Sequence, residues 1–292
     1  MSKVFLVTGS SRGLGREIVT AALAAGHRVP ATARDPRTLD GLVAAHGDRV
    51  RASRLDVTDA DAAERVVREA VEAFGRLDVV VNNAGQGDRA ALEDATLEVF
   101  RRQVDTNFYG TVYVSRATVP VLRRQGGGRI IQISSLGGRI GSPGMSAYHA
   151  AKWAVGGFSE SLAAEVAPLG IKVTVLEPGG GMRTEWAGSS MSTPPVSEPY
   201  RATVGAAAEA MKNFAAEANG DPAKFARAVL TVSALDEPPL RLLLGSDSYT
   251  YGRGAWAGRL GEDEKWRYVS VSTDHDEAEG DGSRWLADQR SD

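Results

Sequence analysis

The sequence predicts an α/β protein in which a doubly wound parallel sheet of about seven strands lies between two layers of helices. Short runs rich in β-branched residues alternate with longer amphipathic segments, an order typical of parallel strands joined by right-handed helical crossovers. The runs are continuously apolar, as expected for strands that are covered on both faces. Three glycines follow the first run and precede a helical segment, which makes the expected three-layer α/β/α architecture Rossmann-like.

Each strand is predicted from an apolar run, and each helix from a segment between two runs. The strands are expected at Val4–Thr8, Arg28–Ala33, Val50–Leu55, Leu77–Asn82, Arg129–Ser134, Ile171–Glu177 and Arg241–Leu244. The helices are expected at about 14–26, 36–46, 59–74, 96–124, 146–168 and 221–234. Val66 and Ala70, for example, belong to an apolar stripe with the i, i+4 spacing of a surface helix. The segment at about 185–220 is rich in Gly, Ser, Thr and Pro before an Ala-rich helix, and we expect it to form a substrate lid.

Composition and charge limit the class of protein. The 292 residues, 42% of them hydrophobic and 24% charged, are typical of a soluble globular protein. The net charge is −3, so no global positive excess favours nucleic acid or an anionic membrane as a partner. Seven acidic residues and two arginines fall within residues 274–292. We expect this segment to be a disordered acidic tail, and residues 1–273 to be a single dinucleotide-binding domain.

Absent sequence features exclude several further kinds of site. The chain has no cysteine, which excludes disulfides, thiolate metal sites and cysteine nucleophiles, and no metal site is expected. The N-terminus reaches a glycine turn before a signal-peptide core could form. No apolar run approaches the roughly 20 residues that span a bilayer. A cytoplasmic location is therefore expected.

The turn after the first strand has the features of a phosphate site. It reads Thr8-Gly9-Ser10-Ser11-Arg12-Gly13-Leu14-Gly15 and leads into a helix. Glycines here let the backbone approach a phosphate, whose charge is favoured by the free N–H groups and the dipole of a helix N-terminus. The predicted dinucleotide-binding residues of this turn are Gly9, Ser11, Arg12, Gly13, Leu14 and Gly15.

The same turn also fits a different class of enzyme. Residues 9–13 match Gly-x-Ser-x-Gly, the strand–turn–helix elbow that carries the nucleophile of α/β hydrolases, with Ser11 as the nucleophile. Such an enzyme needs a histidine late in the chain. The four histidines are His27, His46, His149 and His275, and none lies in an obvious strand-end loop late in the sheet. A serine hydrolase therefore remains an alternative with little support.

Tyr148 and Lys152 form the only Tyr-x-x-x-Lys pair in the sequence. On a helix, residues four apart lie on the same face, so the ammonium group can lie beside the phenol. An adjacent cation favours the phenolate and lowers the pKa of a tyrosine from its usual value of about 10. The pair predicts an acid/base group that exchanges a proton with an alcohol or ketone oxygen near neutral pH.

The residues after the second strand indicate which dinucleotide is bound. Ala33 stands where an acidic residue would hydrogen-bond a ribose 2′-hydroxyl and repel a phosphate, and Arg34 follows it. Arg34 and Arg12 would offer two guanidinium groups to a 2′-phosphate. We therefore predict NADP(H) in preference to NAD(H). An ion pair between Asp35 and Arg34 would weaken this prediction and stays open.

Further motifs follow in a recognisable order. They are Leu55-Asp56-Val57, Asn82-Asn83-Ala84-Gly85, Asp105-Thr106-Asn107-Phe108, Ser134-Ser135 and Pro178-Gly179. Together with the glycine turn and the Tyr/Lys pair, they resemble the short-chain dehydrogenase/reductase family, in its single-domain branch with TGxxxGxG and YxxxK motifs. The resemblance covers about residues 3–245. Within the family, the chain is similar to the 17-beta-hydroxysteroid dehydrogenase-like members.

The resemblance implies a catalytic set of Asn107, Ser135, Tyr148 and Lys152. Ser135 precedes Tyr148 by 13 residues, the separation at which the family places the serine that hydrogen-bonds the substrate oxygen, which favours Ser135 over Ser134. Asn107 is expected to hold a water that links Lys152 to solvent. Lys152 is also expected to bind the nicotinamide ribose.

The resemblance also implies cofactor contacts beyond the glycine turn. Thr184 is expected to reach the nicotinamide carboxamide, although four residues separate it from Gly179 where the family has three. With Arg34, the further expected cofactor-binding residues are Asp56, Val57, Asn83, Ala84, Gly85, Tyr148, Lys152, Pro178, Gly179 and Thr184.

The combined expectation is an NADP(H)-dependent oxidoreductase that interconverts a secondary alcohol and a ketone by hydride transfer, in the direction of ketone reduction, with Tyr148 as general acid/base. Its partners would be a small carbonyl or alcohol substrate and further copies of the chain, in a homodimer or homotetramer built on the helices that carry Asn107 and Tyr148. The alternatives are a non-catalytic NADP-binding regulatory protein and the serine hydrolase.

Overall fold

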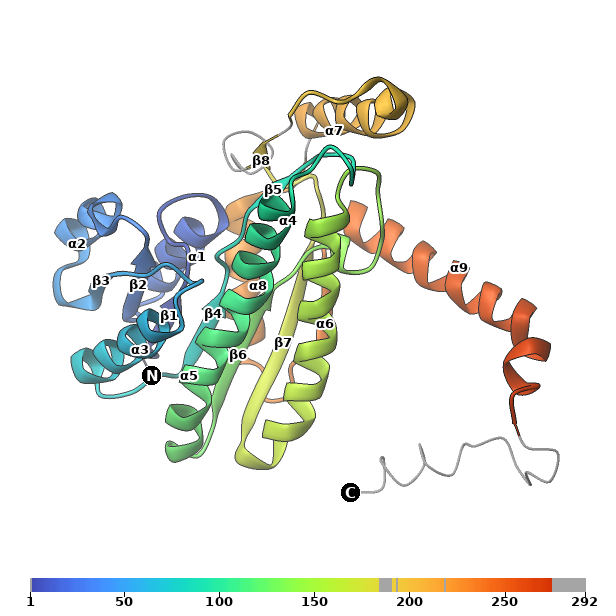
Figure 1. Cartoon of the computed structure of the whole chain (residues 1–292). Coiled ribbons are helices and arrows are strands. Elements are labelled where there is room, and N and C mark those ends of the chain that lie inside the picture. Colours follow the sequence, from blue (N-terminus) through green and yellow to red (C-terminus); the bar gives the residue numbers. More distant parts are fainter. Residues whose placement is uncertain (1, 184–190, 193, 218, 275–292) are drawn as a thin grey trace. The chain divides into compact units, whose positions relative to one another are not determined.

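The computed structural model describes residues 2–183, 191–192, 194–217 and 219–274 (Figure 1). The chain divides into two compact units, Met1–Gly252 and Arg253–Asp292. The sheet, the helices that cover it and the candidate site all belong to the first unit. Helix α9 (Ser246–Val271) begins in the first unit and supplies the regular structure described for the second. The expected acidic tail lies outside the described residues, except for Asp274.

Seven parallel strands form one sheet in the order β3-β2-β1-β4-β6-β7-β9. Each strand lies within two residues of its expected limits, so the predicted doubly wound sheet is confirmed. The strands are β1 (Phe5–Val7), β2 (Val29–Ala33), β3 (Val50–Arg54), β4 (Val79–Asn82), β6 (Gly128–Ile133), β7 (Ile171–Pro178) and β9 (Arg241–Leu244).

Helices cover both faces of the sheet and confirm the three-layer architecture (Figure 1). Because successive residues of a strand turn to opposite faces, Leu6 and Val7 of β1 belong to two different core clusters. The cluster that contains Val7 lies under α1 (Gly13–Ala24), α2 (Asp40–His46) and α8 (Pro222–Ala234). The cluster that contains Leu6 lies under α3 (Ala60–Phe74), α5 (Gly110–Arg124) and α6 (Ser146–Val166).

The helix predicted over 96–124 is not regular throughout. It consists of α4 (Leu97–Val104), one π turn (Asp105–Tyr109) and α5. The prediction of one regular helix over 96–124 was therefore wrong at residues 105–109. Single π turns inside α-helices occur frequently at functional sites, and this one contains Asn107.

Three further features are absent from the sequence-based prediction. Strand β5 (Gly87–Asp88) pairs in parallel with β8 (Met191–Ser192) in a separate two-stranded sheet. The expected Ala-rich helix is present as α7 (Ala206–Ala216), but the π turn Arg201–Gly205 that precedes it was not predicted. Helix α9 was not predicted, because its large apolar side chains do not gather on one face. In the described part of the chain, no helix is long and apolar enough to cross a membrane.

Candidate active site

A cavity of about 550 Å³ opens where the carboxyl ends of the central strands meet. Strand β1 lies between β2 and β4 there, and ligands of doubly wound sheets bind at such a reversal of strand order. Gly15 is the one predicted site residue in the described part of the chain that does not line the cavity, and Thr184 lies outside the described residues. The predicted residues that line it are Gly9, Ser11, Arg12, Gly13, Leu14, Arg34, Asp56, Val57, Asn83, Ala84, Gly85, Asn107, Ser135, Tyr148, Lys152, Pro178 and Gly179.

The glycine turn takes the shape that a dinucleotide site needs. Gly9 and Gly13 have φ angles of 67° and 56°, in the region that favours glycine. A Cβ atom on Gly15 would overlap the carbonyl oxygen of Gly9, so this glycine lets α1 begin directly against the turn. No side chain caps the N-terminus of α1, which leaves its first N–H groups for a phosphate. The turn therefore fits a dinucleotide.

Thr8 and Asn83 fasten the glycine turn to the loop after β4. The Asn83 Nδ2 donates to the carbonyl oxygens of Thr8 at 2.9 Å and of Gly9 at 3.2 Å. The Thr8 Oγ1 accepts from the N–H groups of Asn83 at 2.9 Å and of Ala84 at 3.0 Å. Thr8 is part of the glycine-turn motif, but the sequence alone predicts no role for its side chain.

Asn107 is held by backbone groups on both sides. Its Nδ2 donates to the carbonyl oxygens of Gln86 and Gln103, both at 2.8 Å, and its Oδ1 accepts from the Gln86 N–H at 3.2 Å. A Cβ atom on Gly85 would lie 2.8 Å from the Asn107 Oδ1 and 3.7 Å from the Lys152 Nζ. Gly85 thus lets the asparagine and the lysine approach the same point.

Tyr148 and Lys152 lie one turn apart on α6, with side chains that are almost fully buried. The Lys152 Nζ donates to the Ile133 carbonyl oxygen at 2.9 Å and lies 5.7 Å from the centroid of the Tyr148 ring. Burial lowers the pKa of Lys152 to about 8, because charge is disfavoured away from water.

Burial also raises the pKa of Tyr148 to about 12, while a hydrogen bond with Ser135 acts in the lowering direction. The expected net lowering of the Tyr148 pKa by the adjacent lysine is therefore wrong. The cost of burying a phenolate outweighs the neighbouring cation. Tyr148 carries its proton at neutral pH, the form that a general acid needs.

The two adjacent serines have different surroundings. The Ser134 hydroxyl donates to the Lys152 carbonyl oxygen at 3.2 Å, which ties β6 to α6. The Ser135 Oγ accepts from the Gly137 N–H at 3.0 Å, and Ser135 also hydrogen-bonds Tyr148. Ser135 thus caps the 3₁₀ turn Leu136–Gly138 and contacts the tyrosine.

Just after β2, Asp35 pairs with Arg37 at 2.8 Å rather than with Arg34. The same carboxylate accepts from the Arg37 backbone N–H at 3.1 Å, and these contacts lower its pKa. Arg12 and Arg34 both line the cavity. Asp56 accepts hydrogen bonds from the Thr58 N–H at 3.0 Å and the Thr58 hydroxyl at 2.8 Å, which shapes the neighbouring wall.

In the loop after β7, a glycine is held by a residue from the start of α9. The Gly181 N–H donates to the Asp247 Oδ2 at 3.1 Å. A side chain at Gly179 would overlap that carboxylate. Cavity-lining residues that the sequence motifs did not indicate are Thr58, Gln86, Asp88, Arg102, Thr106, Ile133, Gly180 and Met182. Thr58, Gln86, Thr106 and Gly180 directly adjoin predicted residues, which is the only signal the sequence offers for them.

The family model described as short chain dehydrogenase matches residues 3–194. The chain belongs to the short-chain dehydrogenase family. A relative from Botryotinia fuckeliana, "Oxidoreductase BOA17", is 53% identical and aligns over 94% of this chain and 100% of its own. The chain is therefore a nicotinamide-dependent oxidoreductase that acts on CH–OH groups.

Solved structures agree with this assignment. A short-chain dehydrogenase from Streptomyces avermitilis has a TM-score of 0.88 and 39% identity, covering 94% of this chain and 100% of that one. An alcohol dehydrogenase from Thermococcus sibiricus, complexed with 5-hydroxy-NADP, has a TM-score of 0.69 and 27% identity. It covers 84% of this chain and 96% of that one.

Proposed function

We propose that the protein is an NADP(H)-dependent oxidoreductase that interconverts a secondary alcohol and a ketone, working mainly in the direction of ketone reduction. One observation carries the proposal: a buried, protonated Tyr148 hydrogen-bonds Ser135 at the wall of the cavity, one helical turn from Lys152. Turnover of ketones with NADPH, tested on a panel of simple aliphatic and aryl ketones, is the direct test. Tight NADPH binding with no turnover across the panel would instead favour the regulatory protein.

The residues of the cavity fit the two ends of a dinucleotide. The glycine turn and the first N–H groups of α1 would bind the pyrophosphate, and Asp56 and Val57 would lie against the adenine. Asn83, Ala84, Gly85, Pro178, Gly179 and Thr184 would contact the nicotinamide half. When bound, the nicotinamide supplies the two-electron redox chemistry, and the protein supplies orientation and proton transfer.

In reduction, the Ser135 hydroxyl would hold the carbonyl oxygen of the ketone beside the Tyr148 hydroxyl. The phenol then gives its proton to that oxygen as the alcohol forms. The Lys152 ammonium stabilises the phenolate that remains, and Asn107 would hold the water through which the proton is replaced. Each group lies at the cavity wall, and the backbone contacts of Asn107 and Lys152 fix their positions.

The pH dependence of reduction follows from the two buried groups. Tyr148, with a pKa of about 12, keeps its proton throughout the neutral range, whereas Lys152, with a pKa of about 8, loses its charge above that pH. We expect kcat for ketone reduction to be level below pH 7 and to fall as the pH rises through about 8. Initial rates at saturating NADPH and ketone would measure this, and a plateau that continues well above pH 9 would contradict the role given to Lys152.

The choice of NADP(H) rests on Arg12 and Arg34 at the adenosine end of the cavity, where Asp35 is already paired with Arg37. We expect Arg34→Gln to weaken NADPH binding by about 10- to 100-fold, because hydrogen bonds to a charged group are lost. NADH binding should change little. Fluorescence titration of both cofactors measures this, with Arg65→Gln on α3 as a control outside the cavity. Equal loss of NADPH and NADH affinity would contradict the assignment.

We propose that the segment at about 185–220 forms a substrate lid next to the cavity. Strand β8 contributes Met191 to the wall and is held by its pairing with β5. Asp88 at the end of β5 is ion-paired with Arg102 of α4 at 2.9 Å. Residues 184–190, 193 and 218 of this region lie outside the described residues. The lid and the single domain over 1–273 stay proposals.

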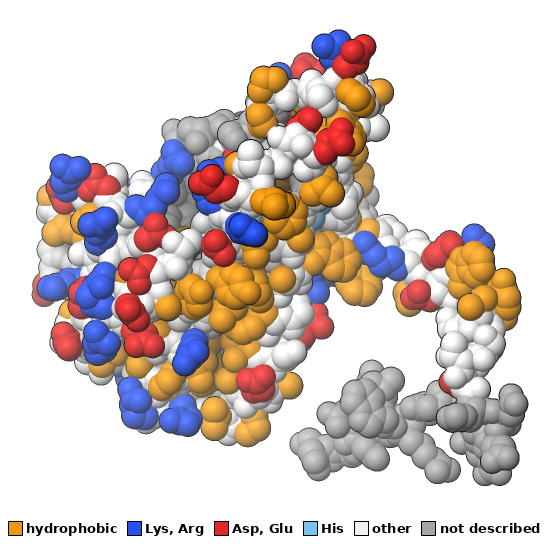
Figure 2. Space-filling view, in the orientation of Figure 1, with side chains coloured by type: hydrophobic (Ala, Val, Ile, Leu, Met, Phe, Trp, Pro, Cys, Tyr) orange, Lys and Arg blue, Asp and Glu red, His pale blue; other side chains and the backbone are white. Residues whose placement is uncertain are grey.

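Exposed apolar side chains support a homodimer or homotetramer built on the helices near the site. Leu97 of α4, Tyr109 of the π turn and Trp153 of α6 are 70%, 43% and 39% exposed. Figure 2 shows hydrophobic side chains gathered over these helices. Such patches mark interaction surfaces in soluble proteins. The cytoplasmic location and the likeness to 17-beta-hydroxysteroid dehydrogenases stay predictions.

The hydrolase alternative gains no support from the cavity. Its nucleophile would be Ser11, which lines the cavity, but no histidine lines the cavity walls described. His149 is part of α6 next to Tyr148, and its Nδ1 accepts from the Ser142 N–H at 3.2 Å. His275 lies outside the described residues.

A further inference from the structure

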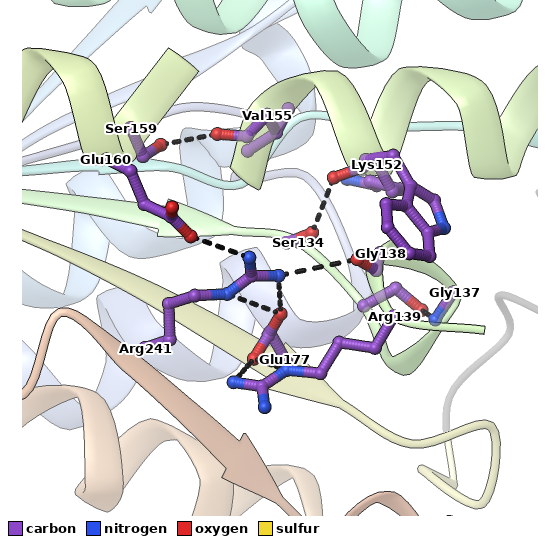
Figure 3. Close-up of polar contacts among 12 residues, drawn as sticks. Ser134, Gly137, Gly138, Arg139, Lys152, Val155, Ser159, Glu160, Glu177 and Arg241 are labelled. Carbon is purple, nitrogen blue, oxygen red and sulfur yellow. Dashed lines mark hydrogen bonds and ion pairs between the residues drawn. The ribbon is translucent and has the colours of Figure 1, made fainter. Parts of the chain in front are cut away.

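A fully buried carboxylate lies between the two loops that flank the nicotinamide end of the cavity. Glu177 is the penultimate residue of β7, and its side chain is 0% exposed. Its Oε2 accepts from the Arg139 Nε at 2.7 Å, and its Oε1 accepts from the Arg241 Nε at 3.2 Å. Figure 3 shows the carboxylate between the two guanidinium groups. Each guanidinium also contacts the same Glu177 oxygen through a terminal nitrogen, so each carboxylate oxygen receives two nitrogens of one arginine.

The two arginines connect Glu177 to the turn that carries Ser135. Arg139 directly follows the 3₁₀ turn Leu136–Gly138, and its N–H donates to the Leu136 carbonyl oxygen at 2.8 Å. Arg241, on β9, donates to the Gly138 carbonyl oxygen at 3.3 Å. Through the two arginines, the Glu177 carboxylate is therefore connected to the C-terminal end of the turn and to the Gly138 carbonyl oxygen.

The position of Glu177 is itself fixed from the other side. The buried Ser248 hydroxyl, in the first turn of α9, donates to the Glu177 carbonyl oxygen at 2.7 Å. The backbone of β7 is hydrogen-bonded to both β6 and β9. Ser135 therefore stands on a short turn whose other end is held by a rigid anchor.

A stability role alone does not account for this arrangement. The Arg139 and Arg241 side chains are 15% and 16% exposed, so three charges have lost most of their water. Desolvation largely cancels the attraction within such clusters, and well-packed apolar side chains often serve stability equally well. Two arginines that each direct two nitrogens at one carboxylate oxygen fix geometry, because the guanidinium is planar and its donors are fixed.

We propose that Glu177 is a positioning residue, which through Arg139 and Arg241 holds the Ser135–Gly138 turn so that the Ser135 hydroxyl meets Tyr148. This inference rests on the proposed function, since Ser135 is there the group that holds the carbonyl oxygen. Glu177 does not line the cavity, so it would act on the substrate only through the turn.

The test is Glu177→Gln, which keeps the shape of the side chain and removes its charge. We expect kcat for ketone reduction to fall by about 10- to 100-fold, because small misplacements of a catalytic group have effects of this size. NADPH affinity should stay within about twofold, since the glycine turn is not involved. In a Ser135→Ala background, Glu177→Gln should lower kcat by no more than about twofold further. Additive losses in the double variant would overturn the proposal.

Matched controls separate positioning from general destabilisation. Glu160 is 49% exposed and contacts Arg241 at 2.8 Å from the opposite side, so Glu160→Gln removes a carboxylate from the same arginine and should change kcat by less than about twofold. Val67→Ala on α3 destabilises the core away from the site and should also preserve kcat. A loss in Glu160→Gln equal to that in Glu177→Gln would overturn the proposal.

Arg139→Lys and Arg241→Lys keep the charge of the arginines and replace Glu177→Gln if that variant fails to fold. The same loss of kcat is expected for them.

A structural readout keeps this test separate from the test of the proposed function. If the wild-type protein turns over no ketone, the proposed function fails, and the crystal structure of Glu177→Gln then decides the positioning role. We expect the 135–138 turn to shift and the Ser135 hydroxyl to lose its contact with Tyr148. An unchanged turn with that hydrogen bond intact would overturn the proposal.

Discussion

Tyr148→Phe is expected to lower kcat for ketone reduction by on the order of 10³-fold while NADPH affinity changes by less than about twofold. The substitution removes the hydroxyl that gives its proton to the carbonyl oxygen, and proton transfer by a positioned side chain contributes effects of this size. The ring itself, which is almost fully buried, is kept. Steady-state rates with NADPH and fluorescence titration of the cofactor measure the two quantities separately.

Tyr113→Phe is the matched control for this result. Tyr113 lies on α5, stacks on Tyr109 with ring centroids 6.0 Å apart, and does not line the cavity. Its substitution should preserve kcat. A Tyr148→Phe enzyme that keeps more than about a tenth of the wild-type kcat would contradict the assignment of the general acid.

Gly15→Ala is expected to weaken NADPH binding by on the order of 100-fold and to lower the free energy of unfolding by about 1–3 kcal/mol. The added Cβ atom would overlap the Gly9 carbonyl oxygen and lie 2.5 Å from the Asn83 Nδ2. The turn would have to move away from α1, which displaces the N–H groups that face the pyrophosphate. Cofactor titration and urea unfolding measure the two effects.

Gly41→Ala tests whether this outcome is specific to the turn. Gly41 lies in α2, and a Cβ atom there would meet no atom within 4 Å. Because alanine favours helix over glycine by about 1 kcal/mol, this variant should be as stable as the wild type or more so, with unchanged NADPH affinity. Equal behaviour of Gly15→Ala and Gly41→Ala would show that the turn has no special role in cofactor binding.

Local patterns were sufficient to predict the sheet and the cavity wall. Apolar runs located the strands at the centre of the sheet, since both faces of the sheet are covered there, whereas the edge strand β3 carries the exposed Arg51 and Arg54. The glycine turn and the Tyr148/Lys152 spacing could be read because their geometry is set within one turn of chain. The cavity brings these segments together from β1, β4, β6 and α6.

Effects that depend on burial and on distant partners were not predictable. The direction of the Tyr148 pKa shift was wrong because burial, which outweighs the neighbouring lysine, cannot be read from spacing. The Asn107 side chain in the π turn is hydrogen-bonded to the Gln86 backbone, 21 residues earlier in the chain, and no local spacing indicates this contact. Glu177 gave no signal, since its partners Arg139 and Arg241 are far from it in sequence.

The most direct test of the central claim is the crystal structure of the protein with NADP⁺. We expect the pyrophosphate at the N-terminus of α1, the 2′-phosphate between Arg12 and Arg34, and the nicotinamide ring facing the Tyr148 hydroxyl. A dinucleotide bound away from the glycine turn, or a nicotinamide ring turned away from Tyr148, would contradict the account.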